Sequence, residues 1–179
     1  MNVKDSEAML FKFLLLFLLG FPFPSQASSK NCPQWVKLNN SPVCFGAKGD
    51  QFGRFTINRN VFVSQFMIVH RSGKVTCRRD YSGSYWGCAP NSPTLFTILT
   101  DSNNKTLAPE ASKVGGVGTY GLGGYDSSSS VLVFCESKKP HCVHANNELR
   151  LWYGEDLTGF TESDNAGKTC ADVYGLLAN

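Results

Sequence analysis

The sequence predicts an all-β protein: an antiparallel β-sandwich or jelly-roll-like single domain held together by disulfides. Three observations support this fold class. Short apolar runs rich in β-branched and aromatic residues recur along the chain, turn residues separate them, and no segment has the periodicity of a long helix. Seven cysteines lie among these runs. We therefore expect a signal peptide over residues 1–27 and one disulfide-linked, secreted domain over residues 28–179.

The predicted signal peptide rests on one apolar run and the small residues after it. Phe13–Leu19 is unbroken and apolar, and Ser25 and Ala27 occupy the −3 and −1 positions of a cleavage site. The run is far shorter than the roughly 20 residues of a membrane-spanning helix. No later stretch comes closer, so no transmembrane segment is expected. The initiator is either Met1 or Met9, because the residues between them dilute the expected positive charge.

Charge is mild overall and uneven along the chain. The formal net charge is +3, which is too small to indicate a nucleic-acid partner. Residues 48–80 contain seven basic and two acidic side chains, whereas residues 148–179 contain six acidic and two basic ones. Such polarity can orient a protein on an anionic glycan or a partner chain. The simpler interpretation is a set of solvated turns and strand faces.

The predicted strands follow from local patterns. Residues 61–69 form the longest β-rich run, a Ser-Gly turn is expected at 72–73, and a further strand follows it. Residues 94–100 and 148–153 alternate in the manner of strands with one buried face. Glycine occupies six of the ten positions from 115 to 124, which predicts a mobile or irregular loop. These glycines match a dinucleotide-binding spacing, but the required strand and helix do not flank them.

All seven cysteines are disulfide candidates. Their spacing favours two local loops and a third pair near the N-terminus: Cys77–Cys88, Cys135–Cys142 and Cys32–Cys44, leaving Cys170. Alternatively, Cys170 bonds Cys32 or Cys44. Because seven is odd, at least one thiol is free or links two copies of the chain into a disulfide-linked dimer.

The segment "HRSGKVTCRRDYSGSYWGC" interleaves cations with aromatic residues. The simpler interpretation is a loop closed by Cys77 and Cys88, with Trp86 packed over the disulfide. The alternative is a ligand-binding surface, because exposed rings stack on sugars while neighbouring polar groups orient them. That surface would consist of Arg78, Arg79, Tyr81, Tyr85 and Trp86.

The segment "ELRLWYGEDLTGFTESDNAG" is expected to be a strand over residues 148–153 followed by an acidic loop that leads to Cys170. The favoured interpretation of this loop is a solvated acidic turn. The alternative is a calcium site, because carboxylate and amide oxygens are the ligands of a hard cation. Calcium is the one cofactor that the sequence suggests, with candidate ligands Glu155, Asp156, Glu162, Asp164 and Asn165.

Three further motifs bear on function. Asn104 begins the glycosylation acceptor Asn-Lys-Thr in a polar stretch that reads as an exposed turn. His141, Cys142 and His144 do not favour zinc, because Cys142 is expected to be oxidised. No Gly-x-Ser-x-Gly elbow and no paired-carboxylate spacing is present, so an enzyme is not predicted.

Four pieces of the chain, "HRSGKVTC", "SGSYWGC", "ELRLWYGEDL" and "ESDNAGKTCADVY", occur in that order. They resemble segments of secreted, largely uncharacterised proteins of corals, sea anemones and related invertebrates, some of which belong to coral skeletal organic matrix. The resemblance implies extracellular residence and supplies no catalytic residue. The predicted function is a non-catalytic extracellular or matrix protein that binds glycan, mineral or matrix partners. The alternatives are a secreted cytolysin or toxin with membrane-inserting aromatics, and a small hydrolase.

Overall fold

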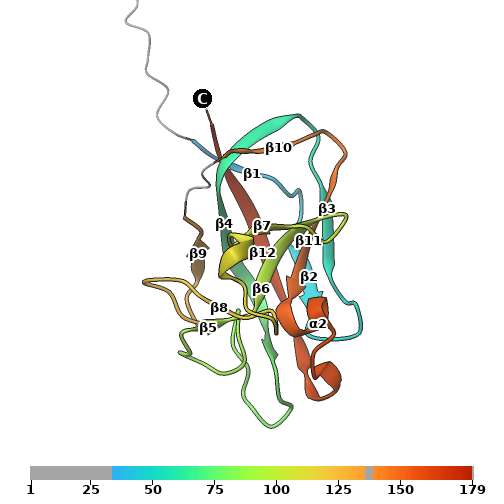
Figure 1. Ribbon diagram of the computed structural model, residues 1–179, viewed down its shortest axis with the longest axis vertical. Coiled ribbons are helices and arrows are strands. Elements are labelled where there is room, and N and C mark those ends of the chain that lie inside the picture. Colours follow the sequence, from blue (N-terminus) through green and yellow to red (C-terminus); the bar gives the residue numbers. More distant parts are fainter. Residues whose placement is uncertain (1–33, 136–138, 179) are drawn as a thin grey trace, which may run out of the picture. The chain divides into compact units, whose positions relative to one another are not determined.

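The computed structural model describes residues 34–135 and 139–178; the predicted signal peptide, both candidate initiators and Cys32 lie outside these ranges. The described residues form three antiparallel sheets, which confirms the predicted all-β class (Figure 1). The elements are β1 (Trp35–Lys37), β2 (Val43–Gly46), β3 (Gly53–Thr56), β4 (Val61–Thr76), β5 (Thr94–Leu95), β6 (Thr97–Asp101), β7 (Thr106–Ala108), η1 (Ala111–Lys113), β8 (Tyr120–Gly121), β9 (Val131–Val133), β10 (His141–Val143), β11 (Glu148–Tyr153), α2 (Gly154–Thr158), η2 (Glu162–Asp164) and β12 (Ala166–Leu177).

Two of the sheets form the sandwich. The six-stranded sheet has the order β1-β12-β4-β10, with β2 also paired to β12 and β9 to β4. The four-stranded sheet has the order β3-β11-β6-β7, and β5 pairs with β8 in a small third sheet. Among the described residues, no helix is both long and apolar enough to cross a membrane.

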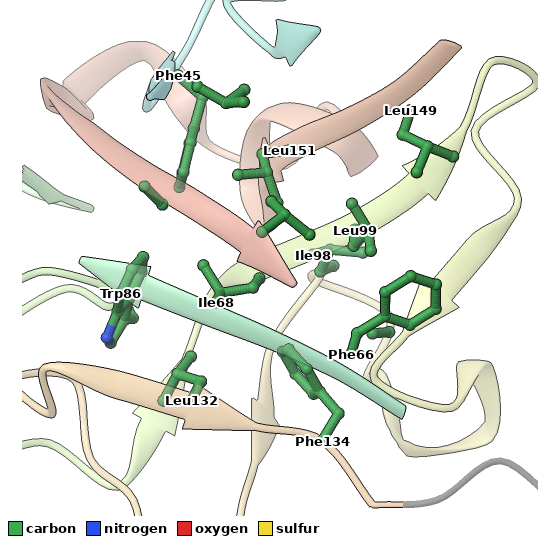
Figure 2. Packing of buried hydrophobic residues seen from close by; sticks show 14 of the residues in the cluster. Phe45, Phe66, Ile68, Trp86, Ile98, Leu99, Leu132, Phe134, Leu149 and Leu151 are labelled. Carbon is green, nitrogen blue, oxygen red and sulfur yellow. The ribbon is translucent and has the colours of Figure 1, made fainter. Parts of the chain in front are cut away.

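The core lies between the two larger sheets, where their apolar faces meet (Figure 2). Ile68 of β4 and Val173 of β12 are neighbours in the six-stranded sheet and are fully buried. Leu99 of β6 and Leu151 of β11 are paired in the four-stranded sheet and are also fully buried. Burying one such side chain contributes roughly 1.5–3 kcal/mol. The predicted strand over residues 148–153 is therefore confirmed as β11, with Leu149 and Leu151 on its core face.

The long strand β4 differs from the prediction, which placed a turn at Ser72-Gly73. The strand continues through these residues to Thr76. Cys170 of β12 pairs with Ser72 and Ala171 pairs with His70, so Arg71 is an extra residue in a β-bulge. Gly73 has a φ of +78°, a conformation that glycine adopts readily in bulges as well as in turns. The Ser-Gly pair therefore marks an irregularity within one strand.

The glycine-rich segment is fixed by specific contacts. Gly115 and Thr119 are joined by a backbone hydrogen bond of 2.8 Å, and the segment contains strand β8. Gly118 has a φ of +77°, and its backbone lies directly against that of Gly154 at the start of α2. A Cβ at either residue would overlap the other backbone. The irregular course was predicted correctly, and the close packing against α2 was not predicted.

The disulfides are Cys77–Cys88, as predicted, and Cys44–Cys170, which was the alternative partner for Cys170. The predicted Cys32–Cys44 bond is wrong, because Cys44 of β2 and Cys170 of β12 are directly paired in the sheet. The predicted Cys135–Cys142 bond is also not formed, and both thiols are free and exposed.

The sheet explains why Cys135 and Cys142 stay apart. Phe134 hydrogen-bonds to Phe66, whereas Cys142 pairs with Phe62. These positions on β4 place the two cysteines about 10 Å apart along the strand. A disulfide needs Cα atoms within about 7 Å. The spacing in the sequence therefore predicted a disulfide between two cysteines that the sheet keeps apart.

Candidate functional site

The acidic segment after β11 begins as a short helix, which the sequence did not predict. Glu155 and Asp156 lie in α2, and Gly159 ends the helix in the left-handed conformation. Only 8% of Glu155, 4% of Asp156 and none of Asn165 is exposed to solvent. The favoured interpretation, a solvated acidic turn, is therefore wrong for these three residues. It holds for Asp164, which is exposed on η2, whereas Glu162 on the same turn is half-buried.

The buried carboxylates are covered by a turn from the other end of the sequence, residues 47–51. Asp156 accepts hydrogen bonds from the backbone N–H groups of Asp50 at 2.8 Å and Gln51 at 3.1 Å. Glu162 accepts from the N–H of Gly49 at 2.8 Å. Asn165 donates its side-chain amide to the carbonyl oxygen of Ala47 at 2.9 Å. The 47–51 turn and the acidic segment thus hold each other in place, and we refer to them together as the acidic site.

Several buried polar atoms beside this turn have no hydrogen-bond partner among the described residues. Two are acceptors, Glu155 Oε2 and Asn165 Oδ1, and two are donor-bearing atoms, Trp152 Nε1 and Tyr153 Oη. All four belong to residues 152–165. A buried polar atom without a partner costs about 1–3 kcal/mol. Trp152 and Tyr153 are neighbours on β11 and face opposite sides of the sheet, so the oxygens of Glu155 and Asn165, which interact with each other, are the two that belong to the acidic site.

The pKa values of the carboxylic acids reflect this burial. Burial raises the pKa of Glu155, although its interaction with Asn165 opposes the change. Burial, followed by a hydrogen bond with Glu162, raises the pKa of Asp156 to about 7. The same hydrogen bond, with the N–H of Gly49, lowers the pKa of Glu162. Asp156 therefore holds a proton more readily than a solvated aspartic acid, and a cation nearby would compete with that proton.

The predicted ligand-binding surface is only partly accessible. Trp86 is fully buried in the core and donates its indole N–H to the carbonyl oxygen of Ser129. Tyr85 is half-buried, and its ring stacks on that of His70 with centroids 3.8 Å apart. Tyr81 is 42% exposed, with the Arg78 guanidinium 4.8 Å above its ring. Two of the three aromatic residues are therefore packing residues, and Tyr81 remains as the exposed ring.

The structure brings the remaining part of that surface to the acidic site. Thr76 at the end of β4 pairs with Ala166 at the start of β12, so the Cys77–Cys88 loop begins beside η2. Arg79 donates to the carbonyl oxygen of Ser163 at 3.2 Å, and Lys48 donates to the same oxygen at 3.2 Å. The basic loop and the acidic segment, 84 residues apart at the Arg79–Ser163 contact, therefore lie at the same end of the sandwich (Figure 1).

The sequence-based reasoning missed two aromatic features beside the acidic site. Phe160 follows the helix-ending glycine and is 46% exposed. Phe52 follows the 47–51 turn, and its ring packs on Trp152 with centroids 4.4 Å apart. The Arg150 guanidinium lies 4.5 Å from the Phe52 ring centroid. Neither residue stands in a recognisable motif, so only the fold could place them here.

The residues predicted to bind a metal do not form a metal-binding cluster among the described residues. Within residues 34–135 and 139–178, no group of three or more His, Cys, Asp or Glu side chains is arranged to hold a metal ion. Cys142 is a free thiol with its Sγ 3.6 Å from Nε2 of His144, so its expected oxidation does not occur here. Among the calcium candidates, Asp156 and Glu162 already accept backbone N–H groups. Glu155 and Asn165 each retain a buried oxygen without a partner.

Asn104 lies in the turn between β6 and β7 and is exposed, with a φ of +61°. Its side-chain oxygen accepts a hydrogen bond from Arg150 at 2.9 Å. Glycosylation of this residue stays a prediction, and the exposed turn is the setting that such a modification requires.

Comparisons with known proteins give one match. No protein-family model matches the chain, and no curated protein matches it. A solved structure, AJLec from the sea anemone Anthopleura japonica, is similar to 82% of this chain and 99% of its own, with 39% sequence identity and a TM-score of 0.72. AJLec comes from a sea anemone, which is a cnidarian. The predicted resemblance to cnidarian proteins is thereby supported at that level.

Proposed function

The chain belongs to the same family as AJLec, and we propose that it is a secreted, non-catalytic glycan-binding protein whose ligand binds at the acidic site. One observation carries the location: Glu155 and Asn165 each keep a buried oxygen without a partner, and the backbone N–H of the exposed Phe160 donates to the Glu155 carbonyl oxygen at 3.0 Å. The exposed rings of Tyr81 and Phe160 would supply stacking surfaces. Sugars are bound by such rings together with a few oriented polar groups.

Calcium is the cofactor that we propose for these residues. A calcium ion takes six to eight oxygen ligands, and Glu155 and Asn165 supply two side-chain oxygens that no other group uses. The further ligands would be backbone carbonyls, water and the hydroxyls of a bound sugar. Asp164 is exposed and close enough to raise the pKa of Glu155, so its negative charge would also favour a cation. Such a calcium site does not require all five of the ligands that the sequence predicted.

The test of glycan binding is a panel of neutral and sulfated glycans, probed with the purified mature protein in calcium and again after chelation. We expect binding to a subset of neutral glycans, and loss of that binding when calcium is removed. If no glycan on the panel binds in either condition, the proposed function is wrong.

The calcium part has its own test, which is the melting temperature with and without calcium. At a calcium concentration of 100 times Kd, binding stabilises the fold by about 2.7 kcal/mol, or roughly 5–10 °C for a chain of this size. Glu155→Gln should abolish the shift. Asp50→Asn is the matched control, because Asp50 is exposed in the same turn and its φ of +56° suits asparagine. A shift that survives Glu155→Gln would place the metal elsewhere.

Residence and partners belong to the same proposal. Secretion is proposed from the leader-like N-terminus and the two disulfides. Within the extracellular space, glycan is favoured over mineral, because Glu155 and Asp156 are too buried to present a charged sheet of carboxylates. The membrane-active alternative loses its support, since Tyr85 and Trp86 are packing residues.

A disulfide-linked dimer is proposed through Cys142. This exposed cysteine pairs across the sheet with Phe62, which is 59% exposed. A free thiol beside an exposed aromatic ring suits contact with a second copy of the chain. A non-reducing gel should show a dimer band that disappears in Cys142→Ser. A dimer band that persists in this variant would assign the link to another cysteine.

A further inference from the structure

The positive charge of the chain is concentrated in the six-stranded sheet. Its strands contain four Lys or Arg side chains and one carboxylate: Lys37, Arg71, Lys74, Lys168 and Asp172. The strands of the four-stranded sheet contain two of each kind: Arg54, Arg150, Asp101 and Glu148. The surplus in the six-stranded sheet therefore equals the formal net charge of the whole chain, +3. The remainder of the sequence is neutral on balance, so this sheet is where an anionic partner would be attracted.

Two of these cations, Lys74 and Lys168, face each other on the outer side of the sheet. Ala171 and Val173 of β12 are fully buried in the core, so alternation along the strand turns Lys168 outward together with Asp172. Lys74 of β4 pairs directly with Lys168, and directly opposite residues project from the same face of a sheet. Both lysine side chains are exposed.

The other two cations continue the same face around Asp172. The Lys37 ammonium lies 2.9 Å from one oxygen of Asp172, and the Arg71 guanidinium donates to the other oxygen. Asp172 is 2% exposed, whereas Lys37 is 36% and Arg71 44% exposed. One buried carboxylate therefore leaves these two cations facing solvent with a net positive charge. From Lys168 to Asp172 is four residues of β12, or about 13 Å. We call the row the basic strip: Lys37, Arg71, Lys74 and Lys168.

The pairing of Lys74 with Lys168 is unfavourable for the protein alone. Among the described residues, neither ammonium has a carboxylate or hydrogen-bond partner, and like charges directly opposite each other destabilise a sheet. A Cβ at Gly73 would overlap the carbonyl oxygen of Lys168, so the two strands are in close contact here. Lysine often protects a sheet edge from further pairing, but β12 lies between β2 and β4 at Lys168. An anion bound across the two ammonium groups would remove the repulsion.

We propose that the basic strip binds a linear acidic polysaccharide, independently of calcium and of the acidic site. An extended chain with anionic groups on successive sugars can contact both ends of the strip at once, whereas a small anion contacts only one pair of cations. The strip begins three residues after Asn165 of the acidic site, but Asn165 is fully buried and Lys168 faces outward. The inference goes beyond the proposed function, because it adds a second class of ligand on a different face.

Two other polyanions fit this surface less well. Proteins that lie on a membrane insert apolar side chains beside their cations, and among the described residues the large exposed apolar side chains are Phe62, Tyr81 and Phe160. Only Phe62 lies in this sheet, nine residues from Arg71 along β4, or about 30 Å. A nucleic acid calls for a larger surplus of positive charge. The polysaccharide is therefore the ligand that the arrangement of charges favours.

Heparin is the probe, titrated by calorimetry into the purified mature protein with a chelator present and at rising NaCl concentrations. Affinity should fall steeply as salt rises, because the bound chain displaces counterions. Lys74→Gln/Lys168→Gln should lower the affinity about 25-fold, at about fivefold for each lysine. Its melting temperature should not fall, since the change removes a like-charge pair. Lys74→Arg/Lys168→Arg keeps both charges and should bind heparin as the wild type does.

The matched control is Lys105→Gln/Lys113→Gln, which removes the same charge at two exposed lysines outside this sheet. Lys105 lies between β6 and β7, and Lys113 lies in η1. This variant should weaken heparin binding by less than about twofold, because salt screens distant charges. Glu155→Gln should bind heparin as the wild type does. Desulfated heparin should bind more weakly than heparin, because it presents fewer charges.

The outcomes separate this inference from the proposed function. Equal losses in the two double glutamine variants, or loss in Glu155→Gln, would overturn the basic strip as an independent site. Phosphatidylserine vesicles or duplex DNA that bind as tightly as heparin, and lose binding in Lys74→Gln/Lys168→Gln, would overturn the polysaccharide as its ligand. Heparin binding at the strip without calcium-dependent binding of any neutral glycan would refute the proposed function and support this inference. Calcium-dependent glycan binding without heparin binding would do the reverse.

Discussion

Replacing Gly118 with alanine should destabilise the protein and weaken its acidic site, although residue 118 is no part of that site. Gly118 has a φ of +77° and lies against the backbone of Gly154, the first residue of α2. The left-handed conformation costs an alanine roughly 1–2 kcal/mol. The overlap of the new Cβ with the Gly154 carbonyl adds about 1–3 kcal/mol of overpacking. We therefore expect a loss of roughly 2–5 kcal/mol.

The assay is urea unfolding, in which the midpoint should fall while the slope stays unchanged. The melting temperature should fall by roughly 5–15 °C. Because Gly154 is followed directly by Glu155, the same displacement should reduce the calcium-dependent rise in melting temperature. Gly116→Ala is the matched control in the same loop, since nothing lies within 4 Å of a Cβ at that residue.

The control variant should stay within about 0.5 kcal/mol of the wild type, or gain slightly from a less flexible unfolded chain. If Gly118→Ala is as stable as Gly116→Ala, the close packing of the glycine-rich segment on α2 is refuted. A stable Gly118→Ala with weakened calcium binding would likewise contradict the reasoning, which derives both effects from one displacement.

Three other predictions follow from the contacts described above. Asp172 accepts hydrogen bonds from Lys37 and Asn39 and is only 2% exposed. Asp172→Asn should therefore lower the free energy of unfolding in urea by roughly 2–4 kcal/mol, and Asp80→Asn, at an exposed residue, by less than about 0.5 kcal/mol. Equal losses in the two variants would refute this difference. Cys44→Ser opens a link across 126 residues and should cost about 4–5 kcal/mol on the chain-entropy account, and a loss under about 1 kcal/mol would contradict it. The pKa of Asp156 is raised to about 7 in the fold, so its contribution to stability is present in acid and is lost as pH rises towards 7. Calcium binding should strengthen over the same rise in pH. A calcium Kd that does not change with pH would contradict this prediction.

Local sequence pattern was sufficient for the strands and insufficient for burial of the acidic residues. β11 has the bounds that alternation predicts, because its apolar side chains face the core along one strand. Asp156 is held by a turn over a hundred residues earlier, which no local window contains. Acidic composition alone therefore predicted a solvated loop.

The remaining differences have similar causes. The favoured interpretation of Trp86 as a packed ring agrees with its burial, and the alternative of an exposed ring is wrong because the indole fills the core beside the sheet. Gly73 reads as a turn because a left-handed glycine serves both turns and bulges. The Cys44–Cys170 bond joins strands that only the sheet order brings together. Each of these features depends on which strand, distant in the sequence, lies next to the residue in the fold.

The most direct test is the glycan affinity of the wild type, Glu155→Gln and Asp50→Asn, measured in calcium by calorimetry with the best ligand from the panel. Glu155 holds a buried oxygen without a partner, whereas Asp50 is exposed in the adjoining turn. We predict that Glu155→Gln loses the calcium-dependent part of binding by at least about tenfold, or 1.4 kcal/mol, while Asp50→Asn binds as the wild type does. Unchanged binding in Glu155→Gln, or equal losses in both variants, would contradict a glycan site at these residues.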